Sequence, residues 1–423
     1  MDNMATIAEN LQIIKNSIDS IKQAIIDKGG TISGDLTTWA SAISGISGGN
    51  AGGSVLKSSV NFYDYDGTLL HSYTKDEFLG LNDLPELPTR EGLICQGWNY
   101  NLTKAKEYVI SYGVLDIGAT YITDDEKTRL YIRIAAPGRM RVPLYFNQSV
   151  ANGVTIDWGD GSSAQTLSGT GNVITIHTYT EIGDYCISLT VNNGTLSLGH
   201  NSSSYSIMGS TSTSSDGGVV YCNMLQRIEI GKGVTSLGNY AFYYCYSLSS
   251  IVIPESVTSI SSSAFYNCYS LSSVVIPESV TSISSSAFYY CYSLSSVVIP
   301  ESVTSLGNYA FCYCYSLSSI VIPESVTSLG NYAFYYCYSL SSVVIPESVT
   351  SISSSAFSSC RGMAFYDFRS AKSVPTLQNS DVFNSISSDC KIVVPDSLYD
   401  SWKAAAKWST YSSKIVKSSE FNL

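Results

Sequence analysis

The C-terminal half of the chain repeats one pattern of hydrophobic and polar residues every 23 positions. The string IPESVTS begins at Ile253 and recurs four more times at this interval, and each copy follows an L-x-x-[IV]-x-I segment. Apolar residues two apart, such as Ile251 and Ile253, point to one face of a short strand. Pro254 then ends the strand, because proline cannot donate to a sheet ladder. One such coil cannot bury its own apolar face, so the pattern predicts a solenoid of stacked coils.

Two rows of residues, one per coil, are expected to face outward from this solenoid. The valine row is Val252, Val275, Val298, Val321 and Val344, and the tyrosine ladder is Tyr246, Tyr269, Tyr292, Tyr315 and Tyr338. Exposed apolar and aromatic rows exceed what a monomer usually shows. Tyrosine also provides contact area at a low cost in conformational entropy. We therefore take both rows as candidate ligand-binding residues, with the alternative that the tyrosines only pack along the coil edges.

Cysteine and glutamate also recur once per coil. The cysteines are Cys222, Cys245, Cys268, Cys291, Cys314, Cys337 and Cys360. Zinc sites use paired cysteines, so single ones at this spacing favour buried free thiols. The glutamates are Glu255, Glu278, Glu301, Glu324 and Glu347. They indicate solvated turn residues, and a weak cation-binding stripe is the alternative.

The repeat IPESVTSIGxxAFxxCxSLxSVxIP, over roughly residues 222–360, resembles the BspA-like leucine-rich repeat family. Members of that family are mostly adhesion or recognition proteins of bacteria, protists and some phages. The resemblance implies a recognition role, and none of the residues in the repeat is a catalytic group.

The N-terminal residues 4–28 carry an apolar seam with helical spacing. Its members are Ile7, Leu11, Ile14, Ile18, Ile21 and Ile25. Isoleucine and leucine in these heptad positions favour trimers or tetramers, and a helical hairpin within one chain is the alternative. The stretch IKQAIIDKGGTISGDLTTWASAI resembles N-terminal segments of phage and prophage tail-associated proteins. A Gly-rich linker follows.

Residues 60–74 alternate around Asp66-Gly67, which predicts a β-hairpin. The Asp64-x-Asp66-Gly67-Thr68 string resembles the nucleophile loop of haloacid-dehalogenase-type phosphatases. We set that interpretation aside, because the pattern over residues 60–200 shows no long helical crossovers.

Residues 130–192 alternate strongly, and the motif from Ile156 to Gly161, with later His177 and Tyr179, is similar to PKD-type β-sandwich domains. Asp157 and Asp160 lack the spacing of a calcium loop, so turn-capping roles are expected. At the other end, residues 398–409 predict an amphipathic helix whose Trp402 and Trp408 cover the open end of the solenoid.

The fold class expected is a mixed multidomain chain, with N-terminal helices, β-sandwich-type modules, and a leucine-rich repeat solenoid with a C-terminal helical cap. The boundaries expected are a helical oligomerisation or docking segment (1–46), a linker (47–56), a small β-rich module (57–128), a PKD-like β-sandwich (129–200), the solenoid (201–395) and the cap (396–423).

The composition narrows the range of functions to be expected. With 23 basic and 34 acidic residues, the net charge of −11 argues against nucleic-acid binding. Only three histidines are present, and no metal-ligand spacing or nucleotide loop is found. We therefore expect no enzyme activity, no cofactor and no metal. No run of about 18 apolar residues occurs, so no membrane insertion is expected.

The sequence shows no secretory signal and no anchor. A phage tail protein needs neither, so the function expected is a homotrimeric phage or prophage tail-fibre or receptor-binding protein in the virion. Its expected partners are a host cell-surface glycan or protein and other tail proteins. The alternatives are a BspA-like adhesin on the bacterial cell surface and an intracellular scaffold.

Overall fold

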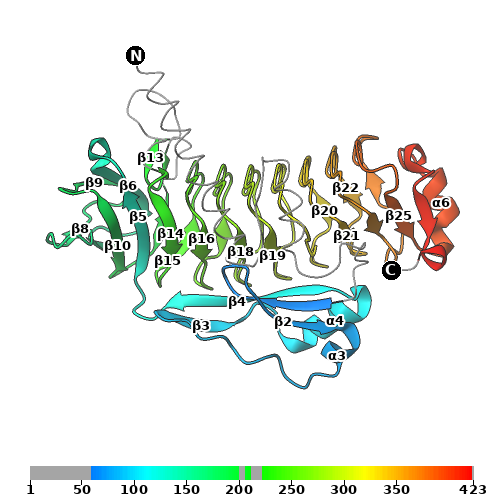
Figure 1. Cartoon of the computed structure of the whole chain (residues 1–423), viewed down its shortest axis with the longest axis horizontal. Coiled ribbons are helices and arrows are strands. Elements are labelled where there is room, and N and C mark those ends of the chain that lie inside the picture. The colour runs from blue at the N-terminus through cyan, green and yellow to red at the C-terminus, as the bar shows by residue number, and fades with distance from the viewer. Residues whose placement is uncertain (1–58, 200–204, 211–221, 422–423) are drawn as a thin grey trace, which may run out of the picture. The chain divides into compact units, whose positions relative to one another are not determined.

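The computed structural model describes residues 59–199, 205–210 and 222–421 (Figure 1). The predicted N-terminal seam and the Gly-rich linker lie outside the described residues.

Residues 59–123 form an α/β unit, which we call the N-terminal module. Its elements are β1 (Ser59–Tyr63), β2 (Leu69–Thr74), α3 (Lys75–Leu79), β3 (Leu93–Trp98), α4 (Leu102–Tyr112) and β4 (Leu115–Thr123), with strand order β2-β1-β4-β3. β1 and β2 pair antiparallel, which confirms the predicted hairpin. β1 and β4 are parallel, and α4 lies in the connection between them.

The expectation that this region lacks a crossover helix is therefore wrong. Helix α4 begins after Asn101, whose side chain accepts a hydrogen bond from the Lys104 backbone N–H, and it ends at Gly113 in the left-handed conformation. Its buried face has helical spacing at Ala105, Tyr108, Val109 and Tyr112. Because two of these four residues are tyrosines, the apolar stripe is weak in the sequence.

Residues 128–198 fold into two facing groups of strands. These elements are β5 (Thr128–Ile134), η1 (Pro137–Arg139), β6 (Arg141–Gln148), β7 (Val154–Asp157), β8 (Gln165–Thr166), β9 (Gly171–Thr178), β10 (Gly183–Val191) and β11 (Leu196–Leu198). The sheets do not stop at a domain boundary. β5 pairs with the first solenoid strand β14, and β11 pairs with β15. The proposed boundary near residue 200 therefore separates segments that share sheets and one hydrophobic core.

The 23-residue repeats form a β-solenoid of stacked coils, as predicted. A small hairpin, β12 (Tyr205–Ser206) and β13 (Gly209–Ser210), precedes it. The solenoid strands are β14 (Leu225–Glu229), β15 (Val234–Leu237), β16 (Ser250–Val252), β17 (Ser259–Ile260), β18 (Ser273–Val275), β19 (Ser296–Val298), β20 (Ser328–Leu329), β21 (Ser342–Val344), β22 (Ser351–Ile352), β23 (Phe365–Asp367), β24 (Thr376–Leu377), β25 (Lys391–Val394) and β26 (Ile415–Lys417). The register is one repeat per coil, so that Val274 pairs with Val297.

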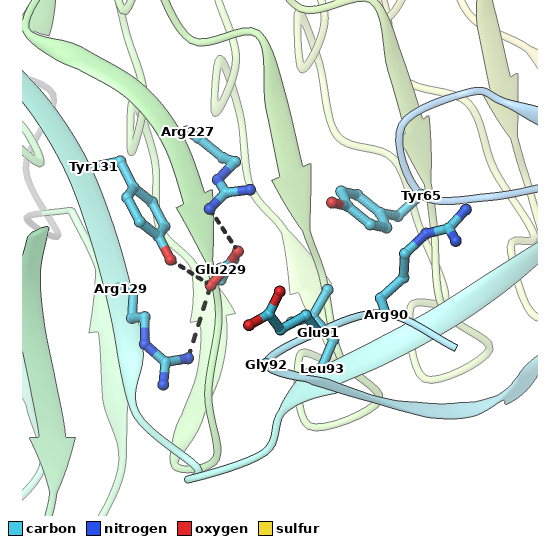
Figure 2. Close-up of a pocket in the computed structure, with 9 residues that line it drawn as sticks. All are labelled: Tyr65, Arg90, Glu91, Gly92, Leu93, Arg129, Tyr131, Arg227 and Glu229. Atoms are coloured by element: carbon cyan, nitrogen blue, oxygen red, sulfur yellow. Dashed lines mark hydrogen bonds and ion pairs between the residues drawn. The ribbon is translucent and has the colours of Figure 1, made fainter. Parts of the chain in front are cut away.

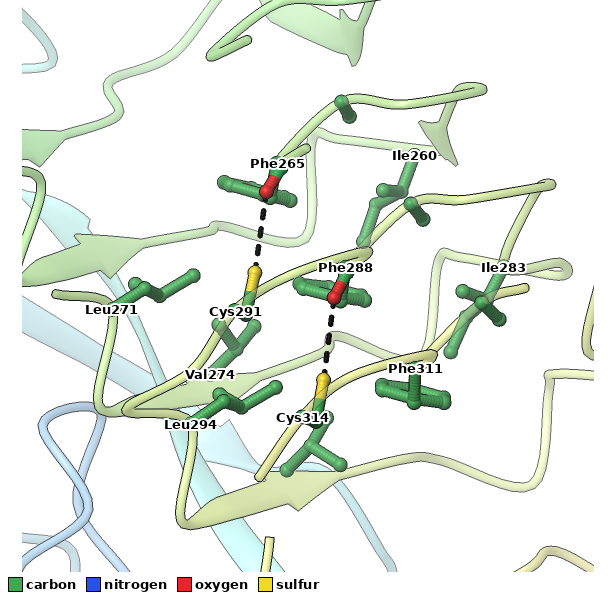
Figure 3. Close-up of a cluster of buried hydrophobic side chains, with 14 of the residues drawn as sticks. Ile260, Phe265, Leu271, Val274, Ile283, Phe288, Cys291, Leu294, Phe311 and Cys314 are labelled. Carbon is green, nitrogen blue, oxygen red and sulfur yellow. Dashed lines mark hydrogen bonds between the residues drawn. The ribbon is translucent and has the colours of Figure 1, made fainter. Parts of the chain in front are cut away.

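The interior is a stack of similar layers, one per coil (Figure 3). The rings of Phe265, Phe288 and Phe311 lie parallel, with centroids 5.0 and 5.3 Å apart. Each cysteine thiol of the middle coils donates to a phenylalanine carbonyl in the preceding coil, as Cys291 Sγ does to Phe265 O at 3.2 Å. The prediction of buried free thiols is confirmed. The thiol fills a small apolar space and gives the carbonyl a second hydrogen bond, because Phe265 O already accepts from Cys268 N at 3.1 Å.

The helices of the C-terminal segment are η2 (Asp396–Leu398), α6 (Tyr399–Ala404), η3 (Trp408–Tyr411) and η4 (Ser418–Glu420), and strand β26 lies between the last two. The predicted helix is therefore interrupted, because Ala405 is extended (ψ 143°) and Lys407 takes a left-handed conformation (φ +67°). Trp402 and Trp408 are both buried in the solenoid core, with ring centroids 5.3 Å apart. Trp408 Nε1 donates to Pro375 O at 2.7 Å.

Candidate recognition surface

The tyrosine ladder is a continuous stack of rings along the solenoid. Successive centroids, from Tyr246 to Tyr338, are 4.6, 4.6, 4.9 and 5.1 Å apart, and the planes of the last three pairs lie within 19° of parallel. All five side chains are partly exposed. Stacking at coil spacing holds each ring between its neighbours, so the ladder is a rigid surface.

A second row of tyrosines braces the ladder. Tyr290, Tyr313 and Tyr336 stack on one another at 4.5 and 4.9 Å. Each also meets the ladder ring two residues later, and Tyr313 and Tyr315 do so edge to face at 5.9 Å. The surface is therefore several rings wide.

Backbone geometry sets the position of this second row. Tyr290, Tyr313 and Tyr336 have φ of +61°, +62° and +60°, a left-handed conformation that costs a non-glycine residue about 1 kcal/mol or more. The same residues donate backbone hydrogen bonds to the next coil, as Tyr313 N does to Tyr335 O at 2.8 Å. These inter-coil bonds offset the strain, and the conformation recurs because each coil supports the next.

The one cation in contact with a described ladder ring is Arg361, whose guanidinium carbon lies 5.4 Å from the centre of the Tyr338 ring. Burial, with a smaller contribution from neighbouring phenols, raises the pKa of Tyr246, Tyr292 and Tyr315 above the usual value. The phenols are therefore neutral hydroxyls, which both donate and accept hydrogen bonds.

The valine row is not exposed, so its assignment to an open ligand-binding face is wrong. Its five side chains are 1%, 5%, 3%, 9% and 8% exposed, in chain order. The valines do point away from the coil interior, but the N-terminal module covers them, with β4 packed along β16, β18 and β19 (Figure 1). Val321 and Val344 join the core of the module, and a Cβ on Gly118 would lie 2.6 Å from Val275 Cγ1.

The N-terminal module binds the solenoid in register, with one polar side chain for each coil. Tyr108 makes the shortest of these bonds, from its hydroxyl to Ile322 O at 2.8 Å. The full series joins Gln96 to Glu255 N, Asn99 to Ile276 O, Tyr100 to Ile299 O, Tyr108 to Ile322 O and Tyr112 to Glu347 N. The partners flank the proline that ends each strand, where backbone groups lack a ladder partner. No sequence pattern pointed to these residues, because each occurs once.

The glutamate row lies in turns, but it is only partly solvated. Glu301 accepts backbone hydrogen bonds from Glu324 and Ser325 of the next coil. Burial raises the pKa of Glu278 and Glu301 above the usual value. The row thus links adjacent coils, and no group of three or more potential metal ligands occurs among the described residues.

The remaining aspartates named from the sequence all have partners, most of them within their own turns. Asp64 is buried and pairs with Arg90, and Asp66 accepts from Thr68 N at 2.9 Å. Asp157 caps the Gly159 N–H at 3.0 Å, which confirms its turn role.

Asp160 also caps its turn, by accepting from Ser162 N at 3.0 Å. Its carboxylate lies 2.6 Å from His177 Nε2. Burial acts to raise its pKa, but hydrogen bonds from Ser162 and His177 outweigh this effect and hold the value at about 2.

Within the described ranges, no helix has the length and apolar character needed to cross a bilayer.

Comparison with known proteins identifies the repeats. The family model "BspA type Leucine rich repeat region" matches residues 172–292, 200–318 and 304–406, which together make up more than half of the chain. No curated protein matches. The PKD-like and phage tail-protein resemblances are not shown by these comparisons.

Three solved structures are similar to the chain. A leucine rich cell surface protein from Faecalibacterium prausnitzii is 24% identical over 45% of this chain and 64% of its own, with a TM-score of 0.30. The T. pallidum leucine rich repeat protein is 25% identical over 43% and 70%, with a TM-score of 0.26. A leucine-rich repeat protein from Bacteroides ovatus is 23% identical over 52% and 61%, with a TM-score of 0.32. The chain thus spans less than two thirds of the first and third of these proteins.

Proposed function

The chain belongs to the BspA-type leucine-rich repeat family, and we propose that it is a non-enzymatic adhesion protein that binds a cell-surface glycan or protein through its tyrosine ladder. The observation that carries the proposal is the ladder itself: a rigid, neutral and partly exposed row of phenols with one ring per coil. Rigid aromatic side chains lose little entropy on binding, which is why they are common in recognition surfaces.

The arrangement of the rings constrains the ligand. Because each ladder ring stacks on its neighbours, most ring faces are covered and the surface presents ring edges and hydroxyls. Such a surface favours a partner that hydrogen-bonds along its length over one that inserts a flat group between rings. An extended glycan or a polar protein segment meets this requirement.

We favour the bacterial cell surface over the virion as the site of action. Family membership rests on the repeats, which the structure describes and the family model matches. The resemblance to phage tail-associated proteins rests on residues 21–43, which lie outside the described residues, and no comparison supports it. Trimerisation through the N-terminal seam stays a prediction.

The experiment replaces the five ladder tyrosines by serine in the full chain. Fluorescently labelled protein is titrated onto cultured epithelial cells and onto bacterial cells, and binding is measured by flow cytometry. We expect binding to fall at least tenfold on the cell type that binds the parent protein, because the contact area and the hydroxyl row are lost together.

The matched control carries five Thr→Ser changes at another exposed row with the same period, namely Thr258, Thr281, Thr304, Thr327 and Thr350. This variant should bind as the parent does. If the tyrosine variant unfolds cooperatively and still binds fully, the ladder is not the recognition surface.

A further inference from the structure

A pocket of about 410 Å³ lies where the N-terminal module meets β5 and the first solenoid strand, β14 (Figure 2). Its walls come from the residues preceding and beginning β3, from Tyr65 near the start of the β1–β2 turn, and from β5 and β14. The volume falls within the range of about 300–1,000 Å³ that small-molecule sites occupy. The pocket is lined by groups other than the tyrosine ladder, so either site can fail without the other.

Guanidinium groups supply fixed hydrogen-bond donors to this pocket. Arg90, Arg129 and Arg227, three of the eight arginines in the chain, line it. Arg227 Nη2 lies 3.1 Å from Glu229 Oε1, and Arg90 pairs with the buried Asp64. The side chains of Arg90 and Arg227 are nonetheless 37% and 39% exposed. A guanidinium carries five N–H donors, so each internal pair orients its arginine and leaves donors for a ligand.

Acceptors and aromatic rings complete the walls. Glu91 places an exposed carboxylate at the pocket. Tyr131 donates from its hydroxyl to Glu229 Oε2 at 2.9 Å, and the Arg227 guanidinium lies 4.1 Å from the centre of its ring. Tyr65 stands on the opposite wall in Figure 2, so rings from two segments of the chain flank the space.

The balance of charge selects the kind of ligand. The lining contains three arginines and two glutamates, and Asp64 and Asp125 pair with two of these arginines. A free anion would meet these carboxylates, and a cation would meet three guanidiniums. A neutral polyol avoids both kinds of charge repulsion. Each of its hydroxyls can accept a hydrogen bond from an arginine and donate one to a carboxylate.

From this geometry we infer that the pocket binds one neutral pyranose sugar. Its hydroxyls lie against the arginines and Glu91, and its apolar C–H edge lies against a tyrosine ring. The sugar is either free or the terminal unit of a glycan, because both present the same ring.

The test uses the full chain and saturation-transfer NMR, with glucose, galactose, mannose and N-acetylglucosamine as separate probes. We expect transfer to at least one of these sugars, with affinity in the ~millimolar range. Glu91→Ala removes an exposed acceptor, and Glu91→Arg fills the space without breaking an internal pair of the pocket. Both should abolish the transfer, whereas Glu86→Ala, an exposed change outside the lining, should keep it.

Two results would overturn the inference. One is a negative saturation-transfer result, in which none of the four sugars receives magnetisation from the protein or the Glu91 variants leave the transfer unchanged. The other is binding of glucuronate about tenfold tighter than of glucose, which would mean that the pocket selects an anion. If the methyl glycoside of the bound sugar binds as well as the free sugar, the terminal unit of a glycan fits; if only the free sugar binds, the site takes free sugar.

Discussion

The valine row and the tyrosine ladder have the same repeat and the same number of members, but they have different environments in the folded protein. The valines are almost completely buried beneath the N-terminal module, whereas the ladder tyrosines are partly exposed and stack on one another. Both rows point away from the coil interior. The difference arises because the N-terminal module, which occurs once in the chain, covers the valine row and leaves the tyrosine ladder exposed.

This difference shows what a repeat does and does not determine. The 23-residue period determines which side chains point into the core and which point outward. It does not decide whether an outward row meets solvent or another part of the same chain. A periodic apolar row is therefore evidence for an interface, and its partner can lie within the molecule.

The largest effect should come from placing a charge in the covered row. Val275→Asp buries a carboxylate against β4 and should lower the free energy of unfolding by about 3 kcal/mol or more in urea denaturation. Gly118→Val places a larger side chain on the other side of the same contact and should lower the free energy of unfolding by a similar amount. Tyr292→Asp, on the open face, should cost less, about 1–2 kcal/mol, because the ring stacking on Tyr269 and Tyr315 is lost but the new carboxylate stays at the surface. Equal losses at the two faces would remove the distinction between them.

Next in size is a pH effect confined to the N-terminal module. Burial raises the pKa of Asp116 from 3.8 to about 6, partly offset by a hydrogen bond from Asn61. The buried carboxyl of Asp116 is therefore more easily accommodated when it is protonated. Its contribution to stability is fully present below the pKa of the unfolded chain and is lost as the pH rises from about 4 to about 6. The loss amounts to roughly 2–3 kcal/mol.

Asp116→Asn keeps a partner for Asn61 and removes the titration. The slope of stability against pH should flatten between about pH 4 and 6, and stability at pH 7 should rise. Denaturation curves at several pH values measure both quantities. An unchanged slope in the variant would mean that Asp116 does not control it.

A smaller effect is expected at the polar contacts between the module and the coils. Tyr108→Phe removes the hydroxyl that bonds to Ile322 O and leaves the ring in place, which should cost about 1 kcal/mol. Tyr292→Phe is the matched change on the open ladder and should leave stability unaltered. Denaturation of the two variants side by side tests the expectation, and it is contradicted if Tyr292→Phe costs as much.

Much of the solenoid could be predicted because its constraints repeat. Phe288 and Cys291 recur at every coil, so their inward orientation follows from the period alone. The hairpin around Asp66 and the turn at Asp157 could also be predicted, because turn chemistry is local. The covering of Val275 could not, since its partner Gly118 lies more than 150 residues earlier and carries no periodic signal. Helix α4 was missed because Tyr108 and Tyr112 form much of its buried face.

Hydroxyl-radical footprinting of the full chain, free and bound to cells, tests most directly whether the two faces have different roles. Mass spectrometry of the digested protein measures labelling at each tyrosine and valine. Tyr269, Tyr292 and Tyr315 should be labelled in the free protein and protected on cell binding, while Val275 and Val298 stay unlabelled in both states. Tyrosine labelling that does not change on binding, or valines that are labelled in the free protein, would contradict this division of the solenoid.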